Sequence, residues 1–127
     1  MKVLVCGGRG YNKFSHVQAT LDSLHKETPI SLIISGAARG ADTLGEQWAK
    51  IRNVPVERFP ADWNEYGKAA GAIRNQQMLD EGRPDLVVAF PGGSGTLDMI
   101  RRAKRSGVKV LEIKERPAAR DEDDRLL

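Results

Sequence analysis

Three short apolar runs in this sequence each end in a glycine-rich turn. Eight of the thirteen glycines lie in these turns: Gly7, Gly8 and Gly10, then Gly36 and Gly40, then Gly92, Gly93 and Gly95. Short β-branched runs that alternate with helical patterns are typical of a parallel sheet covered by helices on both faces. The carboxyl ends of parallel strands meet at one edge of the sheet, so the sequence predicts that the three turns share one site.

The hydrophobic pattern predicts a Rossmann-like three-layer α/β fold with a mostly parallel five-stranded sheet. We expect its strands at residues 2–6, 31–35, 54–59, 85–90 and 108–113. Residues 1–113 are expected to form a single domain. The charged residues 114–127 contain too few apolar side chains to pack, and we expect a flexible C-terminal tail there.

Helical spacing fills the segments between these strands. Ser15 is the expected N-cap of the first helix, and apolar residues spaced from Leu44 to Ile51 predict the second. A third helix is expected at about 69–80, after a polar and aromatic loop at 60–67. A fourth helix is expected to start at the glycine turn that ends in Thr96.

The composition is ordinary for a globular protein, with 40% hydrophobic residues, 29% charged residues and a net charge of +3. The single cysteine, Cys6, excludes an internal disulfide, and two isolated histidines indicate no metal site. We expect neither a metal nor a cofactor. No apolar run approaches the roughly 18 residues of a membrane span, and no signal peptide is recognised, so we expect a cytoplasmic protein with no membrane partner.

The turn after the fourth expected strand carries the main chemical signal. It reads Pro91-Gly92-Gly93-Ser94-Gly95-Thr96, and Pro91 ends the strand because proline has no N–H for a ladder. Three glycines leave the backbone amides uncovered at a helix N-terminus, which is an arrangement that binds phosphate. The alternative is a turn that needs only a positive φ, for which one glycine suffices.

Charged residues near the other turns have two interpretations each. Arg9 and Arg39 can fold back onto a bound phosphate, or can be solvated. Asp42 can accept a hydrogen bond from a ribose hydroxyl, or can cap the helix that follows it. Arg74 and Asn75 can contact a ligand, or can lie on a helix surface.

Three further features suggest chemistry or stacking. Asp98 can stabilise an oxocarbenium charge during glycosidic cleavage, or can be a carboxylate favoured at a helix start. Cys6 can be a nucleophile, although a small buried apolar role suits its neighbours better. Trp63 and Tyr66 can stack on a base or close the core. Neither the P-loop pattern nor the full dinucleotide-binding glycine pattern is present.

Taken together, these motifs resemble the SLOG superfamily, and most of all its small YspA/YpsA-related branch. The resemblance spans residues 1 to about 113 and rests on Cys6–Arg9, Ser35–Asp42, Pro60–Trp63, Arg74-Asn75 and Pro91–Thr96. It implies a Rossmann-like fold, a nucleotide or nucleotide-derived ligand over the glycine turns, and self-association into a homo-oligomer. Relatives in the superfamily are the Lonely Guy phosphoribohydrolases, which cleave the base from nucleoside 5′-monophosphates, and DNA-processing protein A, which binds single-stranded DNA.

The sequence departs from the hydrolases at the catalytic position of their P-G-G-x-G-T-x-x-E motif. Met99 stands where the catalytic glutamate would be, and the nearest carboxylate is Asp98. One residue along a helix turns a side chain by about 100°, so Asp98 does not simply replace that glutamate. The arginine that the hydrolases use before this motif has a counterpart in Arg74. The resemblance therefore implies phosphate binding more strongly than glycosidic catalysis.

Three functions follow as hypotheses. The first is binding of a nucleoside monophosphate or an ADP-ribose-type ligand, as a sensor or carrier. The second is a phosphoribohydrolase in which Asp98 or Asp62 stabilises the sugar cation, with Asp98 and Arg74 as the expected catalytic residues. The third is single-stranded DNA binding through the basic residues from Arg101 to Arg105. The predicted ligand-binding residues are Gly7, Gly8, Arg9, Ser35, Gly36, Ala37, Gly40, Asp42, Asp62, Arg74, Asn75, Pro91, Gly92, Gly93, Gly95 and Thr96.

Overall fold

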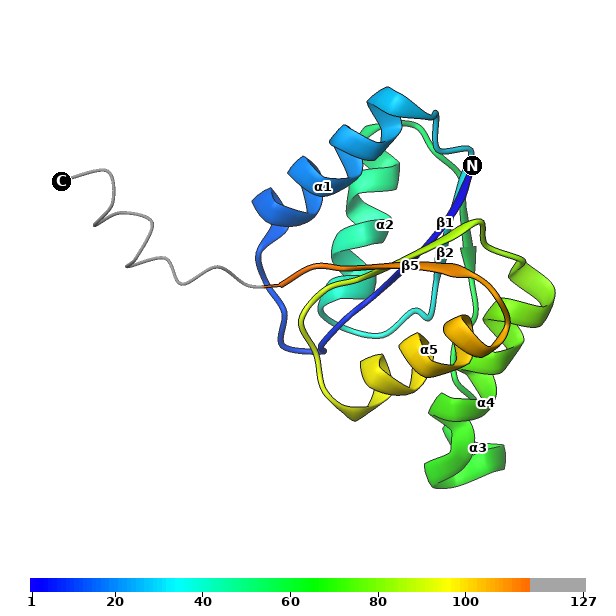
Figure 1. Ribbon diagram of the computed structural model, residues 1–127. Coiled ribbons are helices and arrows are strands. Elements are labelled where there is room, and N and C mark those ends of the chain that lie inside the picture. The colour runs from blue at the N-terminus through cyan, green and yellow to red at the C-terminus, as the bar shows by residue number, and fades with distance from the viewer. Residues whose placement is uncertain (115–127) are drawn as a thin grey trace, which may run out of the picture.

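The computed structural model describes residues 1–114 and has a five-stranded sheet whose neighbouring strands are all parallel (Figure 1). The strands are β1 Lys2–Cys6, β2 Leu32–Ser35, β3 Val56–Arg58, β4 Leu86–Ala89 and β5 Lys109–Glu112, in the order β3-β2-β1-β4-β5. This confirms the predicted α/β Rossmann-like fold. The predicted tail at 114–127 lies outside the described residues, apart from Lys114.

Helices cover both faces of this sheet (Figure 1). Helices α1 Phe14–Glu27 and α2 Ala41–Ile51 lie on one face, and α4 Ala70–Gln77 and α5 Ser94–Arg105 lie on the other. The alternation of side chains along β1 produces this division. Val3 and Val5 pack into the core under α1 and α2, whereas Leu4 packs into the core under α4 and α5. Each of these fully buried side chains contributes roughly 1.5–3 kcal/mol of hydrophobic stabilisation.

The order of the strands places a crevice beside β1. The chain moves outward from β1 through β2 to β3, and then returns to add β4 and β5 on the opposite side of β1. The crossover connections on the two sides lie on opposite faces of the sheet, so the carboxyl ends of β1 and β4 are not covered by a helix passing between them. The first and third glycine turns follow these two strands directly.

Helix boundaries differ from the sequence-based expectations in three places. Helix α1 begins at Phe14, so Ser15 lies inside it, and the N-cap Lys13 makes no side-chain capping bond. Phe14 packs against the core, which fixes the helix start more strongly than the local capping signal. Residues 60–67, expected to be a loop, contain a short helix α3 at Trp63–Tyr66.

The third difference is a π-helical turn, η2, at Met78–Gly82, which follows directly after α4. It continues the chain beyond Gln77 with a wider turn than the expected α-helix. Met78 and Leu79 are both buried in this turn, and they pack into the same core as α5. A regular 3.6-residue pattern over 69–80 cannot indicate such a change of helix type.

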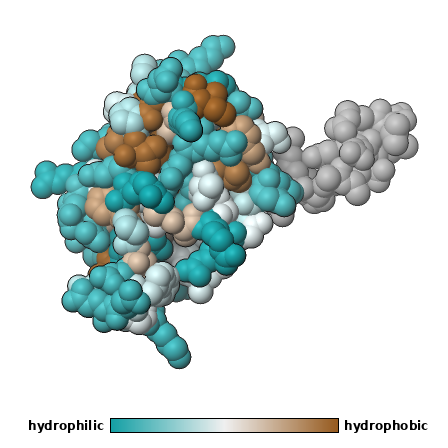
Figure 2. Space-filling model, turned by 180° about the vertical axis from the view of Figure 1, so that it is seen from behind, coloured by the Kyte–Doolittle hydropathy of each residue, from teal (hydrophilic) through white to brown (hydrophobic). Residues whose placement is uncertain are grey.

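The surface seen in Figure 2 is largely hydrophilic, with hydrophobic side chains in small separate groups. Within residues 1–114, no helix is long and apolar enough to cross a bilayer. The large hydrophobic side chains that are exposed are Ile51, Trp63, Tyr66, Ile73, Leu97 and Leu111. The self-association implied by resemblance stays a prediction.

Candidate functional site

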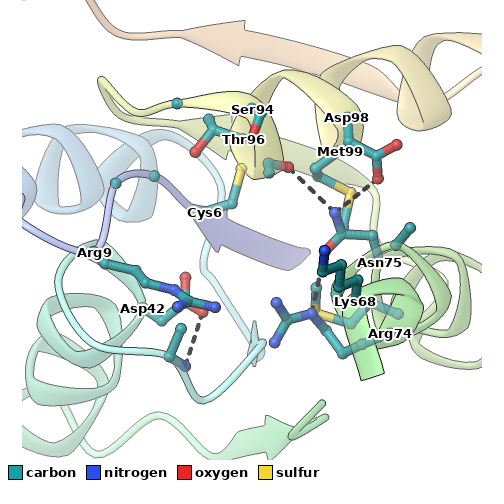
Figure 3. A pocket seen from close by; sticks show the side chains of 18 of the residues that line it. Cys6, Arg9, Asp42, Lys68, Arg74, Asn75, Ser94, Thr96, Asp98 and Met99 are labelled. Atoms are coloured by element: carbon teal, nitrogen blue, oxygen red, sulfur yellow. Dashed lines mark hydrogen bonds between the residues drawn. The ribbon is translucent and has the colours of Figure 1, made fainter. Parts of the chain in front are cut away.

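A cleft of about 600 Å³ opens at the carboxyl edge of the sheet, within the range of roughly 300–1,000 Å³ that small-molecule sites occupy (Figure 3). The three glycine turns meet beside it, as the spacing of glycines predicts. The Gly8 carbonyl accepts hydrogen bonds from the amides of Tyr11 and Ala41, both at 3.2 Å, and the Gly8 amide donates to the Pro91 carbonyl at 2.9 Å. The turns after β1, β2 and β4 are therefore tied to one another by backbone hydrogen bonds.

Some of the turn glycines are required by the close packing of the turns against one another. Gly40 has φ +78°, and a Cβ added there would lie 2.1 Å from the Gly8 carbonyl oxygen. A Cβ at Gly92 would lie 2.2 Å from the Thr96 hydroxyl oxygen and 2.6 Å from the Gly8 amide nitrogen. These contacts leave no room for a side chain. Glycine at these positions is a consequence of how closely the turns approach one another.

Gly93 and Gly95 are different, because nothing lies within 4 Å of a Cβ added at either residue. Neither residue has a positive φ, and Gly93 has φ −103°. Both line the cleft. Glycine in a helix is less favourable than alanine by about 0.8–1 kcal/mol, so folding alone gives no reason for Gly95 in the first turn of α5.

The backbone amides at the start of α5 face the same cleft. The first intrahelical bond is donated by Leu97 to the Gly93 carbonyl, at 3.1 Å. Within residues 1–114, the amides of Ser94, Gly95 and Thr96 have no acceptor in the structure. Donors of this kind at a helix N-terminus favour a bound anion. The amide of Gly8, one of the predicted ligand-binding residues, already donates to the Pro91 carbonyl and is not available to a phosphate.

Among residues 1–114, three cationic side chains line the cleft: Arg9, Lys68 and Arg74. The Arg9 guanidinium lies 5.3 Å from the centre of the Trp63 ring, in a cation–π arrangement. Arg74 donates one hydrogen bond to the Gly36 carbonyl and another to Oδ1 of Asn75 at 3.2 Å. Burial lowers the pKa of Arg74, and the nearby Asp42 carboxylate opposes this effect. An arginine held in this way is well placed to meet an anion.

Asp42 lies in the first turn of α2 and is only 7% exposed, yet it lines the cleft. Its Oδ2 accepts a hydrogen bond from the Ala38 amide at 3.1 Å, in the turn before α2. The helix itself begins after Gly40 with no side-chain capping bond, so Asp42 does not cap it as the sequence suggested. Burial raises the pKa of Asp42 to about 6, despite the opposing effects of the Ala38 amide and of Arg74. Its carboxyl group is part of the cleft wall, where a ligand hydroxyl can reach it.

Asp98 is the second carboxylate in the described lining of the cleft. Its environment differs from that of Asp42, because it favours the ionised form. It accepts a hydrogen bond from Asn75 Nδ2 at 3.0 Å (Figure 3) and another from Arg102 Nε at 2.8 Å. Burial alone would raise the pKa of Asp98, but these two hydrogen bonds and the Arg102 charge lower it below its ordinary value. The Asp98 carboxylate is therefore ionised, and its orientation is fixed by these two hydrogen bonds. Asn75 also donates to the Gly95 carbonyl, at 3.2 Å.

Met99, at the position of the hydrolase glutamate, is 1% exposed. It packs with Met78, Ile100 and Ala103 under the cleft floor. Cys6 also lines the cleft from below, but burial, followed by the Asp42 charge, raises the pKa of its thiol far above the ordinary value. A thiol in this state is not a nucleophile, which supports the small buried role.

Several predicted ligand residues do not line the cleft. Ser35 is fully buried, where its hydroxyl donates to Glu46 at 2.6 Å and accepts from the Ala37 amide at 3.1 Å. Asp62 caps α3 by accepting a hydrogen bond from the Glu65 amide at 3.1 Å. Gly40, Pro91 and Gly92 are not part of the described cleft lining, and Gly36 and Ala37 line a smaller neighbouring cavity. The predicted ligand-binding or catalytic residues that do line the cleft are Gly7, Gly8, Arg9, Asp42, Arg74, Asn75, Gly93, Gly95, Thr96 and Asp98.

Sequence reasoning missed Lys68, which points into the cleft from the turn before α4 (Figure 3). A lysine directly after Gly67 and the aromatic segment was the available signal. The sequence allows Trp63 and Tyr66 either to stack on a base or to close the core. Both are exposed, at 48% and 45%, so neither closes the core, and Trp63 lines the cleft.

The basic residues at the end of α5 do not act as one unpaired group. Arg102 is paired with Asp98 and also donates to Gln76 at 3.1 Å, and Lys104 lies 3.4 Å from Glu112. Part of the positive charge proposed for a DNA track is therefore already balanced within the described residues.

Comparison with known proteins identifies a family model and a similar phage protein. The family described as the YspA, cpYpsA-related SLOG family matches residues 1–66. The gene 61 protein of Mycobacterium phage D29 is 35% identical over 124 residues, which cover 91% of this chain and 98% of that protein.

Solved structures share the fold at lower sequence identity. DNA processing protein A of Streptococcus pneumoniae superposes with a TM-score of 0.73 at 21% identity, over 91% of this chain and 51% of that one. The chain thus spans about half the length of that protein. The C-terminal domain of the PF1911 hydrogenase of Pyrococcus furiosus superposes with a TM-score of 0.51 at 20% identity, over 88% of this chain and 90% of that one.

Proposed function

Because the chain belongs to the YspA, cpYpsA-related SLOG family, we propose that it binds a phosphorylated nucleotide or a nucleotide-derived ligand in the cleft. A phosphate of the ligand lies against the N-terminus of α5. The protein acts as a sensor or carrier of this ligand. A nucleoside monophosphate and an ADP-ribose-type molecule are the two ligand types that this arrangement fits.

The observation that carries the proposal is the pair Gly93 and Gly95. Both are glycines with ordinary φ and with open space where a side chain would be. They lie beside backbone amides that have no acceptor within residues 1–114. A ligand that approaches the backbone closely accounts for both features, because a side chain at either position would occupy its place.

The other parts of the cleft suit the rest of a nucleotide. Arg9, Lys68 and Arg74 supply positive charge toward a phosphate. Asp42, in the opposite wall, can accept a hydrogen bond from a ribose hydroxyl. Trp63 is exposed at the rim and offers an aromatic ring to a base.

The test is a thermal-shift screen followed by calorimetric titration with nucleoside monophosphates, ADP-ribose, free nucleosides and inorganic phosphate. A ligand at about 100 times its Kd should stabilise the folded protein by roughly 2.7 kcal/mol. We expect nucleotides to stabilise the protein and unphosphorylated nucleosides not to do so. Equal responses to nucleosides and nucleotides would contradict a phosphate site at α5.

A second candidate is a phosphoribohydrolase that cleaves the N-glycosidic bond of a nucleoside 5′-monophosphate. It is favoured by one observation, that Asp98 lines the cleft as an oriented carboxylate with a lowered pKa. Such a group can stabilise a developing oxocarbenium charge. Release of free base from a nucleotide panel, abolished in Asp98→Asn, would establish it. Binding without release of base leaves the sensor or carrier function.

A further inference from the structure

A second cavity of about 240 Å³ adjoins the cleft, and we call it the annex. Its walls are the Gly36–Arg39 turn after β2, the segment of Pro60 and Ala61 after β3, and the side chains of Arg9, Trp63 and Arg74. Arg9, Trp63 and Arg74 also line the main cleft. The two cavities therefore meet along a shared boundary, and one ligand can enter both.

The charges in the two cavities differ. The main cleft contains the cations Arg9, Lys68 and Arg74 together with the carboxylates Asp42 and Asp98. The annex is lined by Arg9, Arg39 and Arg74, and no carboxylate belongs to its described lining. Asp42, in the main cleft, partly balances the charges of Arg9 and Arg74, whereas no carboxylate in the described annex lining balances Arg39. The annex lining thus carries a net positive charge, although it is the smaller cavity.

The boundary between the cavities is held in a defined geometry. Arg74 is fixed from both sides, because it donates to the Gly36 carbonyl in the annex wall and to Asn75 beside the cleft. Arg9 rests on the Trp63 ring at 5.3 Å. Arg39, by contrast, is exposed and belongs to the annex alone. One arginine is therefore specific to the annex, and two can contact groups on both sides.

We propose that the annex is a second anion subsite, so that the ligand carries two separated anionic groups. One is a phosphate at the N-terminus of α5, and the other is a phosphate between Arg9 and Arg39. A nucleoside phosphorylated at two positions, or a dinucleotide, has this chemistry. The inference rests on the proposed function, because the first phosphate is the one that the main cleft binds.

The experiment measures calorimetric affinities at fixed ionic strength for a graded set of probes. The probes are a nucleoside 5′-monophosphate, the corresponding 3′,5′-bisphosphate, a 5′-phosphorylated dinucleotide and 5′-phosphorylated oligonucleotides of increasing length. The charge-assisted contacts of a second phosphate should raise affinity by about tenfold or more over the monophosphate. Affinity should then level off beyond two nucleotides.

Two matched variants separate the annex from general charge attraction. Arg39→Gln should remove the gain from the second phosphate, and should leave the affinity for the monophosphate within about twofold. Arg101→Gln removes an equally exposed arginine on α5 outside both cavities, and should leave both affinities unchanged. Thermal unfolding of each variant checks that the fold is retained.

The results separate the two proposals. Binding of the monophosphate with no gain from a second phosphate would overturn the annex and leave the proposed function standing. Equal losses for both probes in Arg39→Gln would also overturn it. Affinity that keeps rising with oligonucleotide length would replace two subsites with a polynucleotide track. If neither the monophosphate nor the bisphosphate binds, both proposals fail.

Discussion

The region where the three glycine turns touch one another differs from the start of α5 in what its glycines face. A Cβ at Gly40 or at Gly92 would lie within 3 Å of backbone atoms of Gly8 in the turn after β1, so a side chain there would collide with the protein. At the start of α5, Gly93 and Gly95 face open space beside free amides. Glycine clusters that look alike in sequence thus have two origins. One kind holds the frame of the site together, and the other leaves room for a ligand.

The largest expected effect tests the frame. In Gly40→Ala, the new Cβ would combine a φ of +78° with a contact of 2.1 Å to the Gly8 carbonyl oxygen. We expect a loss of about 3 kcal/mol or more in the free energy of unfolding, measured by urea denaturation. The control is Gly10→Ala, where nothing lies within 4 Å of the new Cβ. Similar unfolding free energies for the two variants would contradict a packing requirement for glycine at position 40.

A smaller effect concerns Asp42, which the turn after β2 keeps buried. Its pKa is raised to about 6 in the folded protein, against about 3.9 in an unfolded chain. The folded state therefore binds more protons between these values, so the contribution of Asp42 to stability is complete below pH 4 and is lost as the pH rises through 6. The change amounts to about 3 kcal/mol at most.

The measurement for Asp42 is the difference in unfolding free energy between Asp42→Asn and the unmodified protein, from pH 4 to pH 7. We expect the variant to become relatively more stable as the pH rises through 6. Other groups titrate in both proteins and cancel from this difference. A difference that stays constant across the range would mean that Asp42 is not held in the buried environment described for this turn.

A third effect concerns ligand affinity rather than stability. Trp63 lines the cleft, and a base stacked on an aromatic ring contributes about 1–3 kcal/mol. Trp63→Ala should therefore weaken nucleotide binding by about tenfold, measured by titration calorimetry. Tyr66→Ala is the control, because Tyr66 is similarly exposed on the same short helix but does not line the cleft. Equal losses in both variants would contradict a stacking role.

The strands and glycine turns of this molecule could be predicted from its sequence more fully than the side-chain contacts within the site. Alternating apolar runs predicted the five strands, and the glycine spacing predicted that the turns meet, because both depend on local chain geometry. The burial of Ser35 against Glu46 could not be predicted, since the two side chains come from different elements. The same holds for the Arg9–Trp63 contact and for the hydrogen bond that Asn75 donates to Asp98.

Asp62 and Lys68 show the same limit in the short segment between β3 and α4. Asp62 was expected to contact the ligand, and the structure uses it to cap a helix that the pattern did not reveal. Lys68 was not predicted, and that segment turns it toward the cleft. A side chain's neighbours depend on the folded path of the chain on either side, which residue spacing alone does not specify.

The central claim is that residue 95 is a glycine because a side chain there would occupy the place of a bound ligand. One paired measurement tests this claim. Unfolding free energy and nucleotide affinity are measured for Gly95→Ala, with Gly10→Ala as the control for an exposed glycine outside the cleft. We expect Gly95→Ala to be as stable as the unmodified protein, or up to about 1 kcal/mol more stable, while its nucleotide affinity falls by about tenfold or more. Unchanged affinity in a stably folded Gly95→Ala would contradict the account.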